Sequence, residues 1–137
     1  MGRTKACTVA ISLLLVLDFL WLNVFGTAGR FQAMAKRVGG NLPQWAPWQM
    51  GLVLVGAYIL LGWGLCAFGV LPALGAEQPR LAAGLKGALL GLVIYGVYDL
   101  TNLGVFGPTY GLGLAACDVG WGVFVFTAAC LGGVMAA

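Results

Sequence analysis

The sequence predicts an all-α membrane protein whose four transmembrane helices form a compact bundle. Hydrophobic residues make up 61% of the 137 residues and charged residues only 8%, whereas about 25% of the residues of a soluble domain are charged. The mean hydropathy of the chain is +0.98. Four separate runs each reach the length of about 20 mostly apolar residues that a helix needs to cross a bilayer. The expected environment of the chain is therefore the lipid bilayer.

The four expected spans are apolar runs bounded by polar residues, glycine or proline. They cover about residues 6–26, 47–71, 81–104 and 112–136. Arg3 and Lys5 precede the first run, as they would in a signal peptide, but the run extends to Phe25 and is longer than the apolar region of a typical signal peptide. We therefore expect a retained first helix and a single transmembrane domain over residues 1–137.

The connections between the spans differ in polarity. Residues 27–46 place apolar side chains at helical spacing with cations off that stripe, which is typical of a short interfacial helix between the first and second spans. The apolar side chains are those of Phe31, Met34, Ala35 and Val38, and the cations are Arg30, Lys36 and Arg37. Residues 105–111 form a tight uncharged turn, so the third and fourth spans should be antiparallel neighbours.

The distribution of cations narrowly favours an orientation with both termini on the cytoplasm-like side. That side carries four cations and the opposite side three, namely Arg3, Lys5, Arg80 and Lys86 against Arg30, Lys36 and Arg37. We expect an integral protein of a bacterial inner membrane or of an organelle membrane. The net charge of +3 is spread over the terminus and loops, and it gives no reason to expect a nucleic-acid partner.

Several common kinds of catalytic and metal site are excluded by the residue types present. The chain has no histidine, which removes Ser-His-Asp and Cys-His catalysis and histidine metal sites. Its four cysteines are far apart, and none forms a CxxC motif that would favour a metal or redox site. We therefore assign no catalytic residue, and we expect no metal and no cofactor.

Small residues recur at four-residue steps on the last two spans. They are Ala83, Gly87 and Gly91 on the third span, and Ala116 and Gly120 on the fourth. Between helices in lipid, close contact at small residues supplies the attraction that the hydrophobic effect supplies in water. These ridges either pack the bundle internally or contact a partner, which would be another membrane subunit or a second copy of the chain.

Three aspartates lie inside the apolar spans, where a charged aspartate costs about 2.5–3.5 kcal/mol near the helix centre. Asp18 lies just past the middle of the first span. Asp99 is about five residues from the end of the third span and Asp118 about six residues into the fourth, which places both roughly 8–9 Å below the same boundary. We therefore expect Asp99 and Asp118 to meet, and one of two facing carboxyls would keep its proton.

Other polar and aromatic residues accompany the aspartates in the same half of the spans. The predicted polar intramembrane cluster contains Asp18, Asn23, Tyr95, Tyr98, Asp99, Thr101, Asn102, Asp118 and Trp121. Three roles are open for this cluster. It could be a hydrogen-bonded clasp between helices, a proton or cation site, or a pocket for a polar group.

Three segments resemble the hallmark segments of the DUF2177 family of small predicted membrane proteins. They are LDFLWL at 17–22, YDLTNL at 98–103 and DVGWG at 118–122. The resemblance extends over nearly the whole chain and implies a four-span protein. It implies as motif residues Asp18, Trp21, Tyr98, Asp99, Thr101, Asn102, Asp118 and Trp121. It implies no activity, because the family has none assigned.

Three classes of function fit the sequence. The first hypothesis is a structural or accessory membrane subunit, because loops are few and glycine-rich faces are available for packing. The alternative is a small carrier or channel for protons, cations or a small amphiphile, which would use the aspartate cluster. The weakest hypothesis is an enzyme that modifies a lipid or quinone through paired carboxyls, since nucleophile motifs and metal ligands are lacking.

Overall fold

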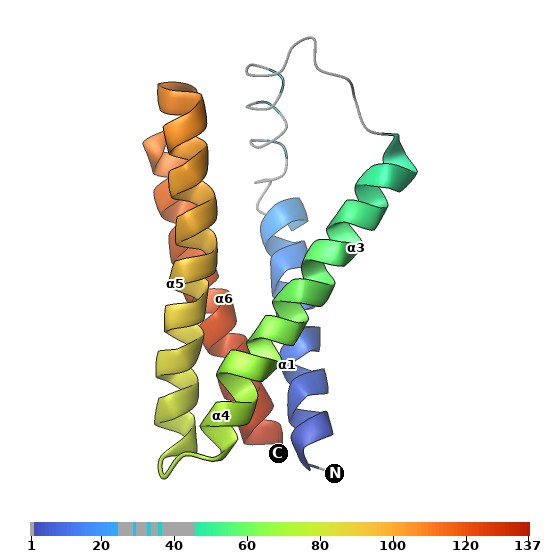
Figure 1. Ribbon diagram of the computed structural model, residues 1–137, viewed down its shortest axis with the longest axis vertical. Helices are drawn as coiled ribbons and strands as arrows, with labels where there is room; N and C mark the ends of the chain where they lie inside the picture. Colours follow the sequence, from blue (N-terminus) through green and yellow to red (C-terminus); the bar gives the residue numbers. More distant parts are fainter. Residues whose placement is uncertain (1, 25–28, 30–32, 34–35, 37–45) are drawn as a thin grey trace.

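The computed structural model describes residues 2–24, 29, 33, 36 and 46–137, and the described chain is helical, without strands. The long helices are α1 (Gly2–Phe19), α3 (Pro47–Gly64), α5 (Pro79–Phe106) and α6 (Leu112–Ala136), as Figure 1 shows. Shorter elements continue them: η1 (Leu20–Val24), η2 (Leu65–Val70), α4 (Leu71–Leu74) and η3 (Gly107–Thr109). The interfacial helix expected over 27–46 falls almost entirely outside the described residues.

Four of these helical stretches are long and apolar enough to cross a membrane, so the fold class predicted from the sequence is confirmed. They are Gly2–Val24, Pro47–Leu74, Pro79–Thr109 and Leu112–Ala136. The third is longer than expected, because α5 begins at Pro79, where proline's missing N–H costs no helical hydrogen bond. Helix α5 itself ends at Phe106, because the positive φ of 59° at the next residue, Gly107, turns the chain out of the α-helix.

Helix α6 is the centre of the bundle, with α5 and α1 packed against it. Figure 1 shows α6 behind the upper part of α5 and separating from it toward the bottom, where α6 lies beside α1. The buried residues of α6 are mostly small or apolar: Ala115, Asp118, Gly122, Val125, Phe126, Ala129, Cys130 and Gly133. An interior helix of this kind must approach its neighbours closely, which small side chains permit.

The contact between α5 and α6 is made backbone to backbone at glycines. A Cβ atom at Gly87 would lie 2.6 Å from the carbonyl oxygen of Phe126, and a Cβ atom at Gly91 would collide with the backbone of Gly122. In the described structure the ridge formed by Ala83, Gly87 and Gly91 is therefore used inside the chain rather than presented to a partner.

The other predicted small-residue pair is not part of that contact. Ala116 and Gly120 are exposed on α6, and a Cβ atom at Gly120 would have no neighbour within 4 Å. The small residues by which α6 meets its neighbours include instead Gly122, which faces Tyr95 of α5, and Gly132 and Gly133, which face Leu13 and Ala6 of α1.

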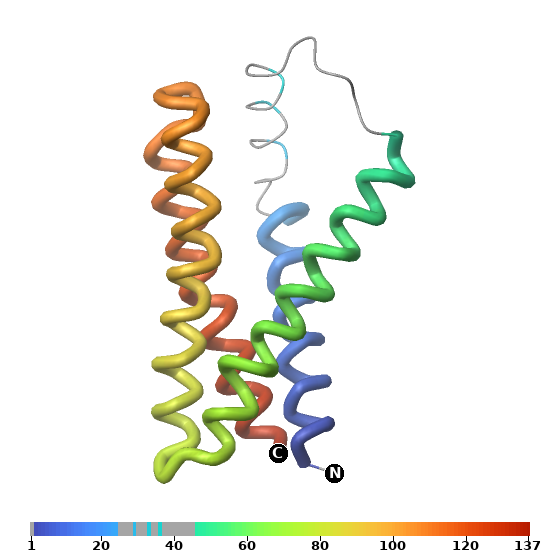
Figure 2. Tube along the Cα trace, in the orientation of Figure 1, coloured from blue at the N-terminus to red at the C-terminus, as the bar shows by residue number. Residues whose placement is uncertain are grey.

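Helix α3 leans away from the bundle along its N-terminal half, as Figure 2 shows in green. Gly62 is the only residue of α3 that is buried, whereas η2 buries Leu65, Gly69 and Val70 against the other helices. The second span therefore packs against the other helices at its C-terminal end and separates from them at its N-terminal end. Both termini lie at the attached end, where a Cβ atom on Gly2 would be 3.3 Å from the carbonyl oxygen of Ala137.

Candidate functional site

Three buried aspartates from three helices form an acidic cluster inside the bundle. Asp18 of α1 is 4% exposed, Asp99 of α5 is 0% exposed and Asp118 of α6 is 5% exposed. Asp118 is the central member of the cluster, because the carboxyls of both Asp18 and Asp99 interact with it electrostatically. Within the described residues, these three carboxyls form no salt bridge. The free-energy cost of burying them must therefore be offset by hydrogen bonds or removed by protonation.

Two tryptophans join α1 and α6 through a reciprocal exchange of hydrogen bonds. The indole N–H of Trp21 donates to Asp118 Oδ1 at 2.7 Å, and that of Trp121 donates to Asp18 Oδ1 at 3.0 Å. The two indole rings stack face to face between these bonds, with centroids 4.7 Å apart and planes 4° apart. We call these four residues the Asp–Trp clasp.

The clasp follows from a short motif that occurs on both helices. Asp18 precedes Trp21 by three residues, and Asp118 precedes Trp121 by the same number. Side chains three apart lie on one face of a helix. Because α1 and α6 run in opposite directions, each aspartate faces the tryptophan of the other helix. Trp21 lies on the π-helical η1, and π-bulges recur at functional sites.

Asp18 receives a further hydrogen bond from α5 and has a neighbour on α3. The Tyr95 hydroxyl of α5 donates to Asp18 Oδ1 at 3.0 Å and lies 3.2 Å from Oδ2. The Tyr58 side chain of α3 is an electrostatic neighbour of the Asp18 carboxyl. Groups from all four spans therefore surround this carboxyl, and the donors Tyr95 and Trp121 compensate for its burial.

Asp99 is held from the turn between α5 and α6. The Tyr110 hydroxyl donates to Asp99 Oδ1 at 2.6 Å. Tyr110 is brought back over α5 by a turn with glycines on both sides, Gly107 with φ 59° and Gly111 with φ 88°. These positive φ values are easily adopted only by glycine. Burial and the hydrogen bond to Asp99 raise the pKa of the Tyr110 phenol, which keeps it a donor.

The second oxygen of Asp99 has a different environment from the first. Asp99 Oδ2 is buried and receives no hydrogen bond from a donor among the described residues. The Asp118 carboxyl is close enough to that of Asp99 for the two to interact electrostatically. Two neighbouring carboxyls can form a hydrogen bond to each other only if one of them carries a proton. This pair therefore has the geometry to bind one proton or another small donor.

The remaining residues of the predicted cluster are placed less centrally. Asn102 is partly buried and lies beside Tyr98 and Tyr110, at the Asp99 end of the cluster. Asn23 is exposed and donates to the carbonyl oxygen of Phe19 on its own helix at 3.0 Å. Thr101 is exposed on α5.

Three partners of the aspartates were not predicted as such from the sequence. The sequence places Trp21 in the same half of the spans as the aspartates, and the family resemblance implies it as a motif residue, but its bond to Asp118 was not predicted, although the repeated Asp-x-x-Trp spacing could have indicated it. Tyr110 lies in a turn that carries no periodic signal. Tyr58 is one aromatic residue among many in an apolar helix, so no sequence pattern distinguishes it from a lipid-facing residue.

The interior between the acidic cluster and the termini is apolar. Its core contains Ala6, Ala10, Leu14, Val125, Phe126, Ala129 and Cys130. Cys66 of η2 is a neighbour of Cys7 of α1 in this half. Within the described residues, no group of three or more metal-binding side chains is arranged to hold a metal ion.

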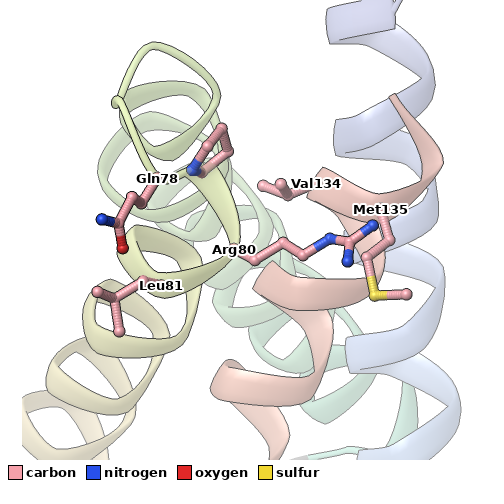
Figure 3. Close-up of a pocket in the computed structure, with 6 residues that line it drawn as sticks. Gln78, Arg80, Leu81, Val134 and Met135 are labelled. Atoms are coloured by element: carbon pink, nitrogen blue, oxygen red, sulfur yellow. The ribbon is translucent and has the colours of Figure 1, made fainter.

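A surface hollow of about 590 Å³ lies at the far end of α5 from Asp99. Figure 3 shows Arg80 reaching from the start of α5 across to Met135 of α6, with Val134 above it in the view. The hollow contains no residue of the acidic cluster. A cation that extends its stem along apolar surface is typical of a residue near the membrane boundary.

Comparison with known proteins agrees with this architecture. A family profile described as a predicted membrane protein (DUF2177) matches residues 4–135, which include all three aspartates and both tryptophans of the clasp. Comparisons with curated proteins and with solved structures gave no match. The chain belongs to the DUF2177 family of predicted membrane proteins.

Proposed function

We propose that this protein is a small membrane carrier whose working group is the acidic cluster, and that the Asp99–Asp118 pair takes up and releases a proton. The observation that carries the proposal is the buried Asp99 Oδ2, which has no described donor although the Asp118 carboxyl lies against its own carboxyl group. A proton between the two carboxyls satisfies that oxygen and removes one charge from the membrane interior.

The apolar half of the bundle favours a carrier over a channel. Leu14, Val125 and Phe126 are fully buried between the cluster and the termini. A file of water or polar groups would be needed to conduct protons continuously through that half. In a single copy of the chain, the cluster is therefore a binding site reached from one side, and release to the other side requires a change in helix packing.

Proton movement by the purified protein tests this proposal. Vesicles containing the protein and a trapped pH-sensitive dye should dissipate an imposed pH gradient faster than empty vesicles. Asp118→Asn should reduce the rate to that of empty vesicles, because asparagine cannot exchange a proton. Glu77→Gln is the matched control, since Glu77 is an exposed acid in the loop before α5. Equal rates for Asp118→Asn and the unchanged protein would overturn the proposal.

An accessory subunit is the second candidate, and the outward face of α6 favours it. Gly113, Ala116 and Gly120 are exposed there, and a Cβ atom at either glycine would have no neighbour within 4 Å. Small exposed residues at this spacing suit close approach of another helix. Ala116→Leu with Gly120→Leu should then reduce the molecular mass of the detergent-extracted assembly, measured by light scattering. An unchanged mass would remove this candidate.

A further inference from the structure

The two halves of the first span are attached to the bundle in different ways. In the half nearer the termini Ala6, Ala10 and Leu14 are fully buried, whereas Asp18 is the only buried residue among residues 15–24. We infer that the Asp–Trp clasp opens when the acidic cluster takes up a proton, and that residues 15–24 then move away from α5 and α6. The inference rests on the proposed function, because it names the change in helix packing that follows proton uptake.

Helices α5 and α6 form the fixed side of this movement. Their backbones touch at glycines, because a Cβ atom at Gly91 would collide with the backbone of Gly122. The Tyr95 ring also lies against Gly122, and it packs edge to face on Phe126 with ring centroids 6.3 Å apart. Helices in such close contact cannot shift past one another without collisions. The two helices and the Tyr95 side chain should therefore move as one unit.

Three hydrogen bonds connect that unit to residues 15–24 of the first span. The Trp21 indole donates to Asp118 at 2.7 Å. Asp18 Oδ1 accepts from both the Trp121 indole and the Tyr95 hydroxyl, each at 3.0 Å. A hydrogen bond to an ionised acceptor is roughly twice as strong as one between neutral groups. Because every acceptor here is a carboxyl, the strength of the attachment depends on the charge of these carboxyls.

A proton taken up by the Asp99–Asp118 pair should weaken the attachment. It reduces the negative charge on Asp118, so the bond from the Trp21 indole loses part of its charge-assisted strength. The two clasp bonds are reciprocal and share a stacked ring pair, so loss of one bond also disturbs the alignment of the other. Among the described residues, the other titratable groups that face the clasp carboxyls are phenols, which stay neutral at acidic pH: Tyr58, Tyr95 and Tyr98.

The structure gives the first span a pivot and room to move. In the half nearer the termini, Gly133 of α6 lies against Ala6 of α1 in an apolar contact. Between α1 and α3 there is a groove of about 600 Å³, which Leu15 and Val55 help to line. Figure 2 shows α3 separating from the bundle beyond this level. The end of the span that carries Trp21 can therefore tilt about its packed half, which is the change in helix packing that proton release requires.

The contact between the two clasp indoles tests the inference directly. The full chain is labelled with fluorotryptophan in lipid bilayers, and solid-state NMR measures the fluorine–fluorine dipolar cross-peak between Trp21 and Trp121. At mildly alkaline pH the cross-peak should be strong, because the ring centroids are 4.7 Å apart. Acidification should lower the ratio of closed to open clasps about fivefold, the factor expected when a charge-assisted bond becomes a neutral one. The cross-peak should weaken accordingly, and an unchanged cross-peak would overturn the inference.

Two variants separate opening of the clasp from other effects of acid. Asp118→Asn keeps the acceptor of the Trp21 bond neutral at every pH, so its cross-peak should already be weak at mildly alkaline pH and should not respond to acid. Glu77→Gln changes an exposed acid in the loop before α5 and should keep the full response. A response in Asp118→Asn equal to that of the unchanged chain would contradict the inference.

This measurement is independent of proton movement across the membrane, because it is made without a pH gradient. A constant indole contact in a protein that still dissipates a pH gradient in vesicles would overturn the inference and leave the proposed function in place. An indole contact that responds to acid in a protein that dissipates no gradient would support opening of the clasp and overturn the carrier proposal alone.

Discussion

The two halves of the bundle interior are built from the same helices but are stabilised by different interactions. In the half nearer the termini, small apolar residues such as Ala10 and Ala129 let the helices approach closely. In the half nearer the α5–α6 turn, three buried carboxyls accept hydrogen bonds from three of the spans and from the turn itself. The comparison shows that packing holds the first half together and hydrogen bonding the second, so substitutions should act on them differently.

Loss of the close backbone contact between α5 and α6 should have the largest effect on the stability of the fold. Gly91→Leu would force a side chain into the backbone of Gly122 and should destabilise the fold by about 3 kcal/mol or more. The yield of monodisperse protein after detergent extraction and its unfolding midpoint measure this. Gly84→Leu is the control, because a Cβ atom at Gly84 meets nothing within 4 Å. Similar losses in both variants would show that helix propensity or insertion, rather than the contact, is responsible.

The Asp–Trp clasp should give the next largest effect. Trp21→Phe and Trp121→Phe keep an aromatic ring but remove the indole N–H, and each should cost about 1–3 kcal/mol because a buried carboxyl loses a donor. The two substitutions share a stacked pair, so their combined effect should differ from the sum of the single effects. A double-mutant cycle of unfolding free energies that closes additively would contradict the reciprocal arrangement.

Tyr110 should contribute less to the free energy of unfolding, and its contribution should depend on pH. Tyr110→Phe removes the donor to Asp99 Oδ1 and should cost about 1 kcal/mol at neutral pH. The pKa of Tyr110 is raised in the folded protein, so its contribution is full below the ordinary tyrosine pKa of about 10 and is lost as the pH rises through the raised value. Unfolding midpoints of the two proteins should therefore converge in strong alkali. A gap that widens with pH would contradict this assignment.

Two residues of the predicted cluster should matter least. Asn23→Ala and Thr101→Ala remove exposed side chains, and the Asn23 amide donates to the carbonyl oxygen of Phe19 instead of to an aspartate. Each should change the unfolding free energy by about 0.5 kcal/mol or less, and proton movement should be unaffected. A loss of proton movement in either variant would extend the working site beyond the acidic cluster.

The sequence predicts the spans well because apolar length is a local property of the chain. It also predicts the meeting of Asp99 and Asp118, since a short turn between two helices fixes their relative depth. It does not reveal that α3 diverges, because lipid-facing and protein-facing surfaces of a membrane helix are similarly apolar. Nor does it identify Tyr58 and Tyr110 as partners of the aspartates, because those contacts depend on helix rotation and on the path of a turn.

The central claim of the account is that Asp99 and Asp118 share one proton inside the bundle. Infrared spectroscopy tests it directly through the carbonyl stretch of a protonated carboxylic acid at neutral pH. The account predicts this band in the unchanged protein and in Glu77→Gln, and its loss or shift in both Asp99→Asn and Asp118→Asn. Absence of the band from the unchanged protein, or its persistence at the same frequency in both asparagine variants, would contradict the claim.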